Sequence, residues 1–394
     1  MTPALFSVIQ SLCRVGLGAD NPAFRRQVER LREVLAESEA KTEVAALDRL
    51  LSAAARSAGM QPSKVTVSPA FAGTETLTPQ TPLPVDRETG AALAEVIFPG
   101  SRPLDFPLLD AKLEEATLSV VEELRQHEKL RAAGVTPPVA CLLYGPPGTG
   151  KTRIALVMAA RLGLPVVLAR LDGVISSFLG TTGRNVANLF TFANRYNCLL
   201  LLDEFDAIAK VRDDPHEVGE IKRVVNAILQ NIDSRKSRGI TVAITNHEQL
   251  LDTAVWRRFD VRIAIPPPAF AERIKIAERY FDSEEIQGAT SRFIAWLTEG
   301  MTGADIEVMA KIIKRHRALR PDTQLLDALR HYSATQAGRT NARHQTVLAL
   351  SSLQLAREMD GSPELSLTQK EIGVILGTSQ TQVGRWLKEP SVAA

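Results

Sequence analysis

The chain has 394 residues, enough for two or three domains of ordinary size. With 45% hydrophobic and 23% charged residues it has a globular composition, which excludes a disordered or collagen-like chain. Lysine and arginine number 47 against 45 for aspartate and glutamate, and the net charge of +2 does not by itself indicate a nucleic-acid partner.

The cysteines are few and widely separated. Cys13, Cys141 and Cys198 match no disulfide framework and no metal-ligand spacing, which is typical of a reducing compartment. The N-terminus lacks a basic leader, and no apolar run approaches the roughly 20 residues that span a bilayer. We therefore expect a soluble cytoplasmic protein with no membrane partner.

Two kinds of pattern fill the N-terminal quarter of the chain. Apolar residues between Phe24 and Leu51 recur at helical spacing among many charges, which predicts a helical hairpin within residues 1–59. Residues 60–96 carry repeated proline and threonine with little apolar periodicity. This composition predicts an extended linker.

Short apolar runs then alternate with helical patterns over residues 97–268. The runs are VACLLY, PVVLARL, CLLLLD, ITVAIT and VRIAI. They are apolar on both sides, as in a parallel sheet covered by helices on both faces, so we expect an α/β core. After the prolines at 266–268 only helical patterns follow, and the segment near 345–394 is expected to form a separate small unit.

A glycine-rich segment follows VACLLY and precedes a helical stretch, the context of a P-loop. Its glycines let backbone N–H groups face a β-phosphate, and the helix N-terminus adds its positive dipole end. Lys151 is placed to bridge the β- and γ-phosphates, and the Thr152 hydroxyl to bind Mg²⁺. The predicted nucleotide-binding residues are Gly145, Pro146, Pro147, Gly148, Thr149, Gly150, Lys151 and Thr152.

Polar residues follow the third and fourth expected strands, CLLLL and ITVAIT. Asp203 stands at the carboxyl end of CLLLL, where parallel sheets bind ligands, and can hold the Mg²⁺ shell. Glu204 is placed to polarise the attacking water. An acidic pair alone would indicate only a capped strand end, but together with the P-loop it predicts ATP hydrolysis. Asn246 can orient water or contact the γ-phosphate.

Two adjacent arginines, Arg257 and Arg258, close this region. Both cannot point into the site of their own subunit without crowding, so their expected use is at the γ-phosphate bound by a neighbouring subunit. Such an arginine finger contributes on the order of 10³- to 10⁵-fold in turnover. The alternative is a solvated pair bridged to Asp260.

Taken in order, GPPGTGKT, LLLLDEFDA, ITNH and WRRFD resemble the AAA ATPases, the group of FtsH, katanin and spastin. Within this group the chain is similar to prokaryotic single-ring ATPases often encoded beside subtilisin-like proteases. The resemblance implies an AAA+ P-loop core with a five-stranded parallel sheet over residues 97–268, a helical lid over 269–338, and a ring, usually a hexamer. ATP and Mg²⁺ are the implied cofactors, Asn246 the sensor, and Arg257 and Arg258 the residues acting in trans.

The resemblance also extends to the lid and to a central pore. Gly303 and Ala304 match the lid motif near the adenine, with Ala304 where wider relatives carry an arginine. Phe178, Leu179 and Gly180 match the aromatic–aliphatic–glycine loop that lines the channel. We expect the large apolar side chain of this loop to be exposed because it contacts a polypeptide in the channel. The alternative is that it packs on the core of its own subunit and anchors the loop there.

Residues 367–387, within a tail over 339–394, resemble a helix-turn-helix, with Gly373 at the helix crossing, Gly377 in the turn and Ser379 as N-cap. The outward residues able to meet phosphates and base edges are Gln380, Thr381, Arg385 and Lys388. From Arg339 to Ala394, however, the sequence has six basic and five acidic residues, a net charge of +1. DNA contact and docking of a protein partner or neighbouring subunit therefore both remain open.

The main hypothesis is an ATP-driven ring that remodels or threads a protein substrate, with the N-terminal helices presenting substrate or an adaptor. The alternative is a DNA-bound ATP switch in mobile-element, defence or regulatory function. An inactive nucleotide-binding scaffold is disfavoured by the intact set of hydrolytic residues. The pattern does not define the substrate or whether a protease partner exists.

Overall fold

The computed structural model describes residues 75–100, 104–170, 179–206, 218–281, 288–336 and 342–389, with single residues between 9 and 51 and at 338 and 340. The chain divides into two compact units, Met1–Val67 and Ser68–Ala394. In the first unit the described residues are helical, and Val28, Leu35 and Leu47 form a small buried cluster. The predicted hairpin otherwise lies outside the described residues.

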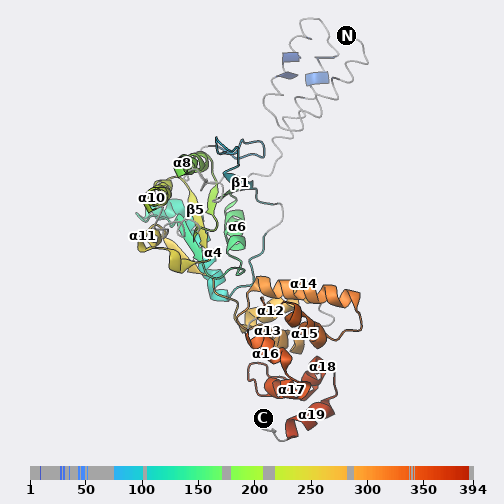
Figure 1. Cartoon of the computed structure of the whole chain (residues 1–394). Helices are drawn as coiled ribbons and strands as arrows, with labels where there is room; N and C mark the ends of the chain where they lie inside the picture. Colours follow the sequence, from blue (N-terminus) through green and yellow to red (C-terminus); the bar gives the residue numbers. More distant parts are fainter. Residues whose placement is uncertain are drawn as a thin grey trace. The chain divides into compact units, whose positions relative to one another are not determined.

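A six-stranded sheet with the order β1-β3-β4-β5-β2-β6 is the centre of the α/β part of the second unit (Figure 1). The strands are β1 (Ala94–Ile97), β2 (Ala140–Tyr144), β3 (Val166–Ala169), β4 (Leu199–Leu202), β5 (Ile240–Thr245) and β6 (Val261–Ala264). Strands β2 to β6 coincide with the five expected apolar runs and pair in parallel. The α/β class with a parallel sheet is therefore confirmed, and β1 is an additional edge strand.

The end of the segment that we expect to be a linker is part of this core. Strand β1 pairs antiparallel with β3, with Ala94 opposite Ala169. Ahead of it, Asp86 is buried and accepts a hydrogen bond from Asn185 Nδ2 at 2.8 Å, on helix α8 (Leu179–Arg195). The linker prediction is thus wrong for residues 75–96, since a four-residue strand is too short to show an apolar period.

Helices cover both faces of the sheet. In β4, Leu200 and Leu202 belong to the cluster under α8 and α10 (Val218–Arg235), whereas Leu199 and Leu201 belong to the cluster on the other face. That face is covered by α4 (Ala111–Arg125) and α6 (Lys151–Leu162). Successive strand residues point to opposite faces, so a strand buried on both sides must be apolar at every position. Short helical segments complete the core: α5 (His127–Ala132), η2 (Glu248–Leu250) and α11 (Thr253–Trp256).

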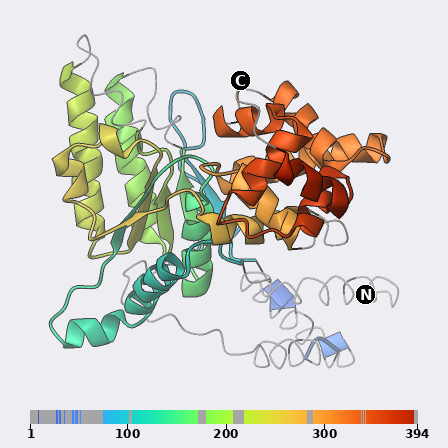
Figure 2. The same cartoon turned by 90° about the horizontal axis from the view of Figure 1, so that it is seen from below.

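All the described elements after β6 are helices (Figure 2). Those of the expected lid are α12 (Phe270–Tyr280), α13 (Ala289–Leu297), α14 (Gly303–Leu319) and α15 (Leu325–Thr335). Those of the expected tail are α16 (Ala342–Ala349), α17 (Ser352–Asp360), α18 (Gln369–Leu376) and α19 (Gln380–Lys388). No helix among the described residues is both long and apolar enough to cross a bilayer.

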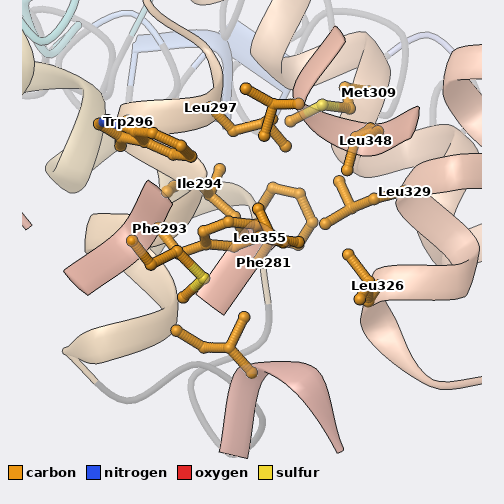
Figure 3. Packing of buried hydrophobic residues seen from close by; sticks show 14 of the residues in the cluster. Phe281, Phe293, Ile294, Trp296, Leu297, Met309, Leu326, Leu329, Leu348 and Leu355 are labelled. Atoms are coloured by element: carbon orange, nitrogen blue, oxygen red, sulfur yellow. The ribbon is translucent and has the colours of Figure 1, made fainter. Parts of the chain in front are cut away.

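A single apolar core joins the lid and the tail. Figure 3 shows Leu348 and Leu355 of the tail among Phe281, Ile294 and Leu329 of the lid. The same cluster includes Ile372, Ile375 and Val383 of α18 and α19, all buried. The tail is therefore not the separate small unit that the sequence suggested, because its apolar residues complete the lid rather than a core of their own.

Candidate nucleotide site

A cavity of about 630 Å³ lies where the carboxyl ends of the central strands meet the starts of α6 and α14. Parallel sheets bind ligands at this edge. Residues from separate parts of the sequence meet there, including members of all four predicted groups. Among them are Pro147, Gly148, Thr149, Gly150, Lys151, Thr152, Asp203, Glu204, Asn246, Gly303 and Ala304. The fold thus brings together the predicted P-loop, acidic pair, sensor and lid residues.

Close packing fixes the shape of the P-loop. Gly145 has φ +138°, and a Cβ there would lie 2.3 Å from the Ile265 carbonyl oxygen. At Gly148, with φ +78°, a Cβ would lie 2.6 Å from Thr302 Oγ1 and 3.0 Å from Ala304 Cβ. Both positions therefore require glycine. The Ala304 N–H donates to the Gly148 carbonyl at 3.2 Å, so the lid helix α14 begins in direct contact with the loop.

Lys151 is only 4% exposed, and its ammonium lies within the loop. Its Nζ donates to the carbonyl oxygens of Gly145 at 2.8 Å and Pro146 at 2.6 Å. Burial lowers the pKa of this group, and the Asp203 carboxylate opposes that shift. A desolvated ammonium held by two carbonyls can exchange them for phosphate oxygens, which are stronger partners for a cation.

Thr152 and Asp203 fit a magnesium ion. The Thr152 hydroxyl donates to Asp203 Oδ2 at 2.9 Å, which places a hydroxyl and a carboxylate oxygen side by side. Oxygen ligands of this kind are those that Mg²⁺ prefers, usually completed by phosphates and water. No group of three or more metal-ligating side chains occurs in the part of the chain described. An ion here would therefore be held jointly with the nucleotide.

The predicted acidic pair, Asp203 and Glu204, follows β4 directly. Glu204 is exposed to the cavity and has φ +52°, a left-handed conformation that costs a non-glycine residue about 1–2 kcal/mol. Its N–H donates to Asp203 Oδ1 at 2.8 Å, and the next N–H, of Phe205, donates to the Ile244 carbonyl of β5 at 2.8 Å. The turn that carries Glu204 is thus fixed to the neighbouring strand.

Asp206 connects the end of β4 to the end of β5 through hydrogen bonds. The sequence alone indicates no role for it. It is buried, and its Oδ1 accepts from Thr245 Oγ1 at 3.2 Å and from the Asn246 N–H at 3.3 Å. The His247 N–H donates in turn to Thr245 Oγ1 at 3.0 Å. The carboxylate thereby orients the turn that carries Asn246. Its only signal in the sequence is that it is the second aspartate of DEFD.

The structure distinguishes the two arginines. Neither Arg257 nor Arg258 is among the residues that line the cavity. Arg258 forms an ion pair with Asp233 of α10 at 2.5 Å, whereas Arg257 is exposed. The alternative of a pair bridged to Asp260 is wrong, because Asp260 pairs instead with Lys236 and accepts from the Ala140 N–H.

The other predicted residues that the structure describes, in the pore loop and the tail, are not among those that line the cavity. Leu179 and Gly180 are the first two residues of α8, and Phe178 lies outside the described residues. In the tail, Ser379 caps α19 as expected, and Trp386 packs against the shared core. The four candidate DNA-contact residues, Gln380, Thr381, Arg385 and Lys388, are all exposed.

Comparison with known proteins agrees with this site. Residues 141–267 match the model of the ATPase family associated with various cellular activities (AAA). A protein of Sinorhizobium fredii named "Uncharacterized AAA family ATPase y4kL" is 37% identical over 250 residues, covering 62% of this chain and 74% of that protein. The chain belongs to the AAA ATPase family. It therefore hydrolyses ATP.

Other relatives match a smaller part of their own length. The proteasome-activating nucleotidase of Thermococcus onnurineus is 32% identical, over 58% of this chain and 59% of that protein. That of Pyrococcus furiosus is 31% identical, over 60% of its length. The chain thus spans about three fifths of these nucleotidases. Among solved structures, the crystal structure of the FIGL-1 AAA domain matches with a TM-score of 0.46 and 24% identity, over 55% of this chain and 74% of that one.

Proposed function

We propose that this AAA ATPase works as a homo-oligomeric ring, a hexamer, that remodels a protein substrate by threading it through a central pore. The observation that carries the proposal is the position of Arg257. This exposed arginine stands outside the nucleotide cavity of its own chain. A cation that acts at a phosphate must reach one, and a neighbouring subunit provides it.

In this proposal each residue of the site has a defined task. Lys151 binds the phosphates, and Thr152 and Asp203 hold Mg²⁺, which would neutralise charge on the phosphates. Glu204 accepts a proton from the attacking water, and Asn246 orients that water. Arg257 stabilises the transferred phosphoryl group from the adjacent copy, while Arg258, bound to Asp233, holds the turn in place.

The partners follow from relatives and from the sequence. Nucleotidases named for activating a proteasome support a protein substrate that is passed on for degradation. We infer a protease of the subtilisin-like kind as the receiving partner, on the resemblance of the motifs. Helices of the first unit would present substrate or an adaptor. The few, widely spaced cysteines of the chain support a cytoplasmic location for this activity.

A green fluorescent protein carrying an unstructured tail provides the test. The chain with ATP and Mg²⁺ is expected to abolish its fluorescence, and Phe178→Ala is expected to stop this unfolding while leaving most of the ATPase rate. Phe178→Tyr serves as the matched control, since it keeps a large ring. Equal loss of unfolding and ATPase in Phe178→Ala would assign this residue to the core of the subunit instead.

A second candidate function is a DNA-bound ATP switch. One observation favours it: α18 and α19 are joined by a tight turn and leave a polar helix face exposed. The two functions are compatible, because a DNA-bound tail could direct the ring to the site where its substrate is found. Because the tail completes the lid core, point variants are the suitable test: Arg385→Ala/Lys388→Ala, at two exposed positions, is expected to weaken DNA binding if this function holds.

A further inference from the structure

The turn between α18 and α19 has a fixed geometry. Only the residues from Gly377 to Ser379 separate the helices, and Gly377 takes the left-handed conformation with φ +66°. Ser379 Oγ accepts from the Gln382 N–H at 3.2 Å and so caps α19. A Cβ on Gly373 would lie 2.7 Å from the Thr378 carbonyl oxygen, so the turn packs directly on α18. This arrangement consists of a short helix, a tight turn and a second helix. In DNA-binding proteins it places the second helix in the major groove.

Polar contacts hold this pair of helices on the rest of the tail and lid. Glu371 of α18 accepts from Thr368 and also pairs with Arg292 of the lid helix α13 at 3.0 Å. At the other end, the Arg357 guanidinium of α17 donates to the Trp386 carbonyl at 2.9 Å and so closes the last turn of α19. The outward face of α19 is therefore presented by a rigid support.

The charge on this face differs from that of the whole tail. Between Gln369 and Lys388 the cations are Lys370, Arg385 and Lys388, all exposed. The one acid in this range is Glu371, and its carboxylate is already bound by Arg292 and Thr368. Gln369 Oε1 lies near Gly384, which brings the start of α18, with Lys370, beside the middle of α19, with Arg385. Within the near-neutral count for residues 339–394, Arg385 and Lys388 thus share one face of α19 at a spacing of three residues, and the exposed acid Glu389 follows directly.

We propose that α19 docks in the major groove of double-stranded DNA. Arg385, Lys388 and Lys370 contact phosphates on either side of the groove. Gln380 and Thr381, at the N-terminal end of α19, approach the base edges, where the second helix of this arrangement reads sequence. The inference goes beyond remodelling and supplies the contact that the second candidate function needs.

The test measures binding of a fluorescein-labelled, mixed-sequence 30-base-pair duplex to the full chain by anisotropy, at several salt concentrations. We expect Arg385→Ala/Lys388→Ala to weaken binding and to make the slope of log K against log salt less steep by about 1.8, since each phosphate contact contributes about 0.9. Arg315→Ala/Arg320→Ala is the charge-matched control, because both arginines are exposed at the end of α14. This control is expected to keep the wild-type slope.

Three outcomes would overturn the proposal. The first is no duplex binding by the wild-type chain, which would also remove the DNA-switch function. The second is an equal change of slope in the α19 variant and in the α14 control, which would show only general attraction to a polyanion. The third is affinity for the single strand equal to that for the duplex, since a groove is then not needed. Unfolding of the tagged fluorescent protein by the same preparations tests remodelling separately.

Discussion

Asp206 fixes the turn that carries Asn246, the proposed sensor, next to the end of β4, which Glu204, the proposed water-polarising residue, follows. Its carboxylate accepts from Thr245 Oγ1 and from the Asn246 N–H through one oxygen, Oδ1. Asp206→Ala removes this oxygen, and we expect kcat for ATP to fall about tenfold, equivalent to ~1.4 kcal/mol of barrier, with KM nearly unchanged. Asp206→Asn keeps the oxygen and is expected to retain most of the rate. Steady-state kinetics would contradict this role if both variants lost kcat equally or if KM rose instead.

The sequence predicts those site residues whose position depends only on the neighbouring sequence. The P-loop, Asp203 and Glu204 follow strands directly, so their spacing identifies them. Asp206 acts through a residue in another strand, and the ion pair of Arg258 with Asp233 likewise depends on the fold. No spacing rule connects such partners, so the different surroundings of Arg257 and Arg258 could be found only in the structure.

Two glycines of the α18–α19 pair, Gly373 and Gly384, are expected to differ in how much an alanine substitution destabilises the fold. A Cβ on Gly373 would meet the Thr378 carbonyl at 2.7 Å, and backbone cannot move aside easily. A Cβ on Gly384 would meet Gln369 Oε1 at 3.1 Å, the end of a flexible side chain. We expect Gly373→Ala to lower the free energy of unfolding by about 1–3 kcal/mol and Gly384→Ala to change it by less than about 1 kcal/mol. Urea unfolding with the opposite order would contradict the packing.

His344 makes the stability of the core shared by lid and tail depend on pH. It is fully buried on α16 beside the ring of Tyr332, and burial lowers its pKa from 6.5 to about 4. Between these values the unfolded chain binds a proton that the folded chain does not, so the stability contributed by this site falls as pH drops through that window. From pH 7 to pH 5 we expect a loss of about 2 kcal/mol. Tryptophan fluorescence in urea, compared with His344→Phe, measures it; an equal loss in the variant would exclude His344 as the source.

Elements that pack on a distant part of the chain were the hardest to predict. All five apolar runs proved to be strands, because burial on both faces leaves a continuous signal. Strand β1 is short and borders the sheet, and the tail helices show an apolar face without showing what it covers. The sequence pattern therefore does not reveal the edge strand, and it does not reveal that the tail shares the core of the lid.

At the scale of the whole molecule, the nucleotide site and the α19 face are connected through the lid. Ala304 of α14 contacts the P-loop at Gly148, and the lid core continues into α18 and α19. A change in the P-loop that moves the lid would therefore move α19 as well. Arg257, which we propose as the catalytic arginine, is not among the residues that line the cavity of its own chain. We therefore expect that a neighbouring subunit in an oligomer supplies the arginine to each nucleotide site.

Mixing two inactive variants tests this claim most directly. Glu204→Gln lacks the proton acceptor but keeps Arg257, whereas Arg257→Ala keeps the acceptor but lacks the arginine. We expect the mixture to hydrolyse ATP faster than the sum of the separate variants, because some interfaces then regain a complete site. A rate equal to that sum, under conditions where the two variants assemble together, would contradict an ATP site shared between subunits.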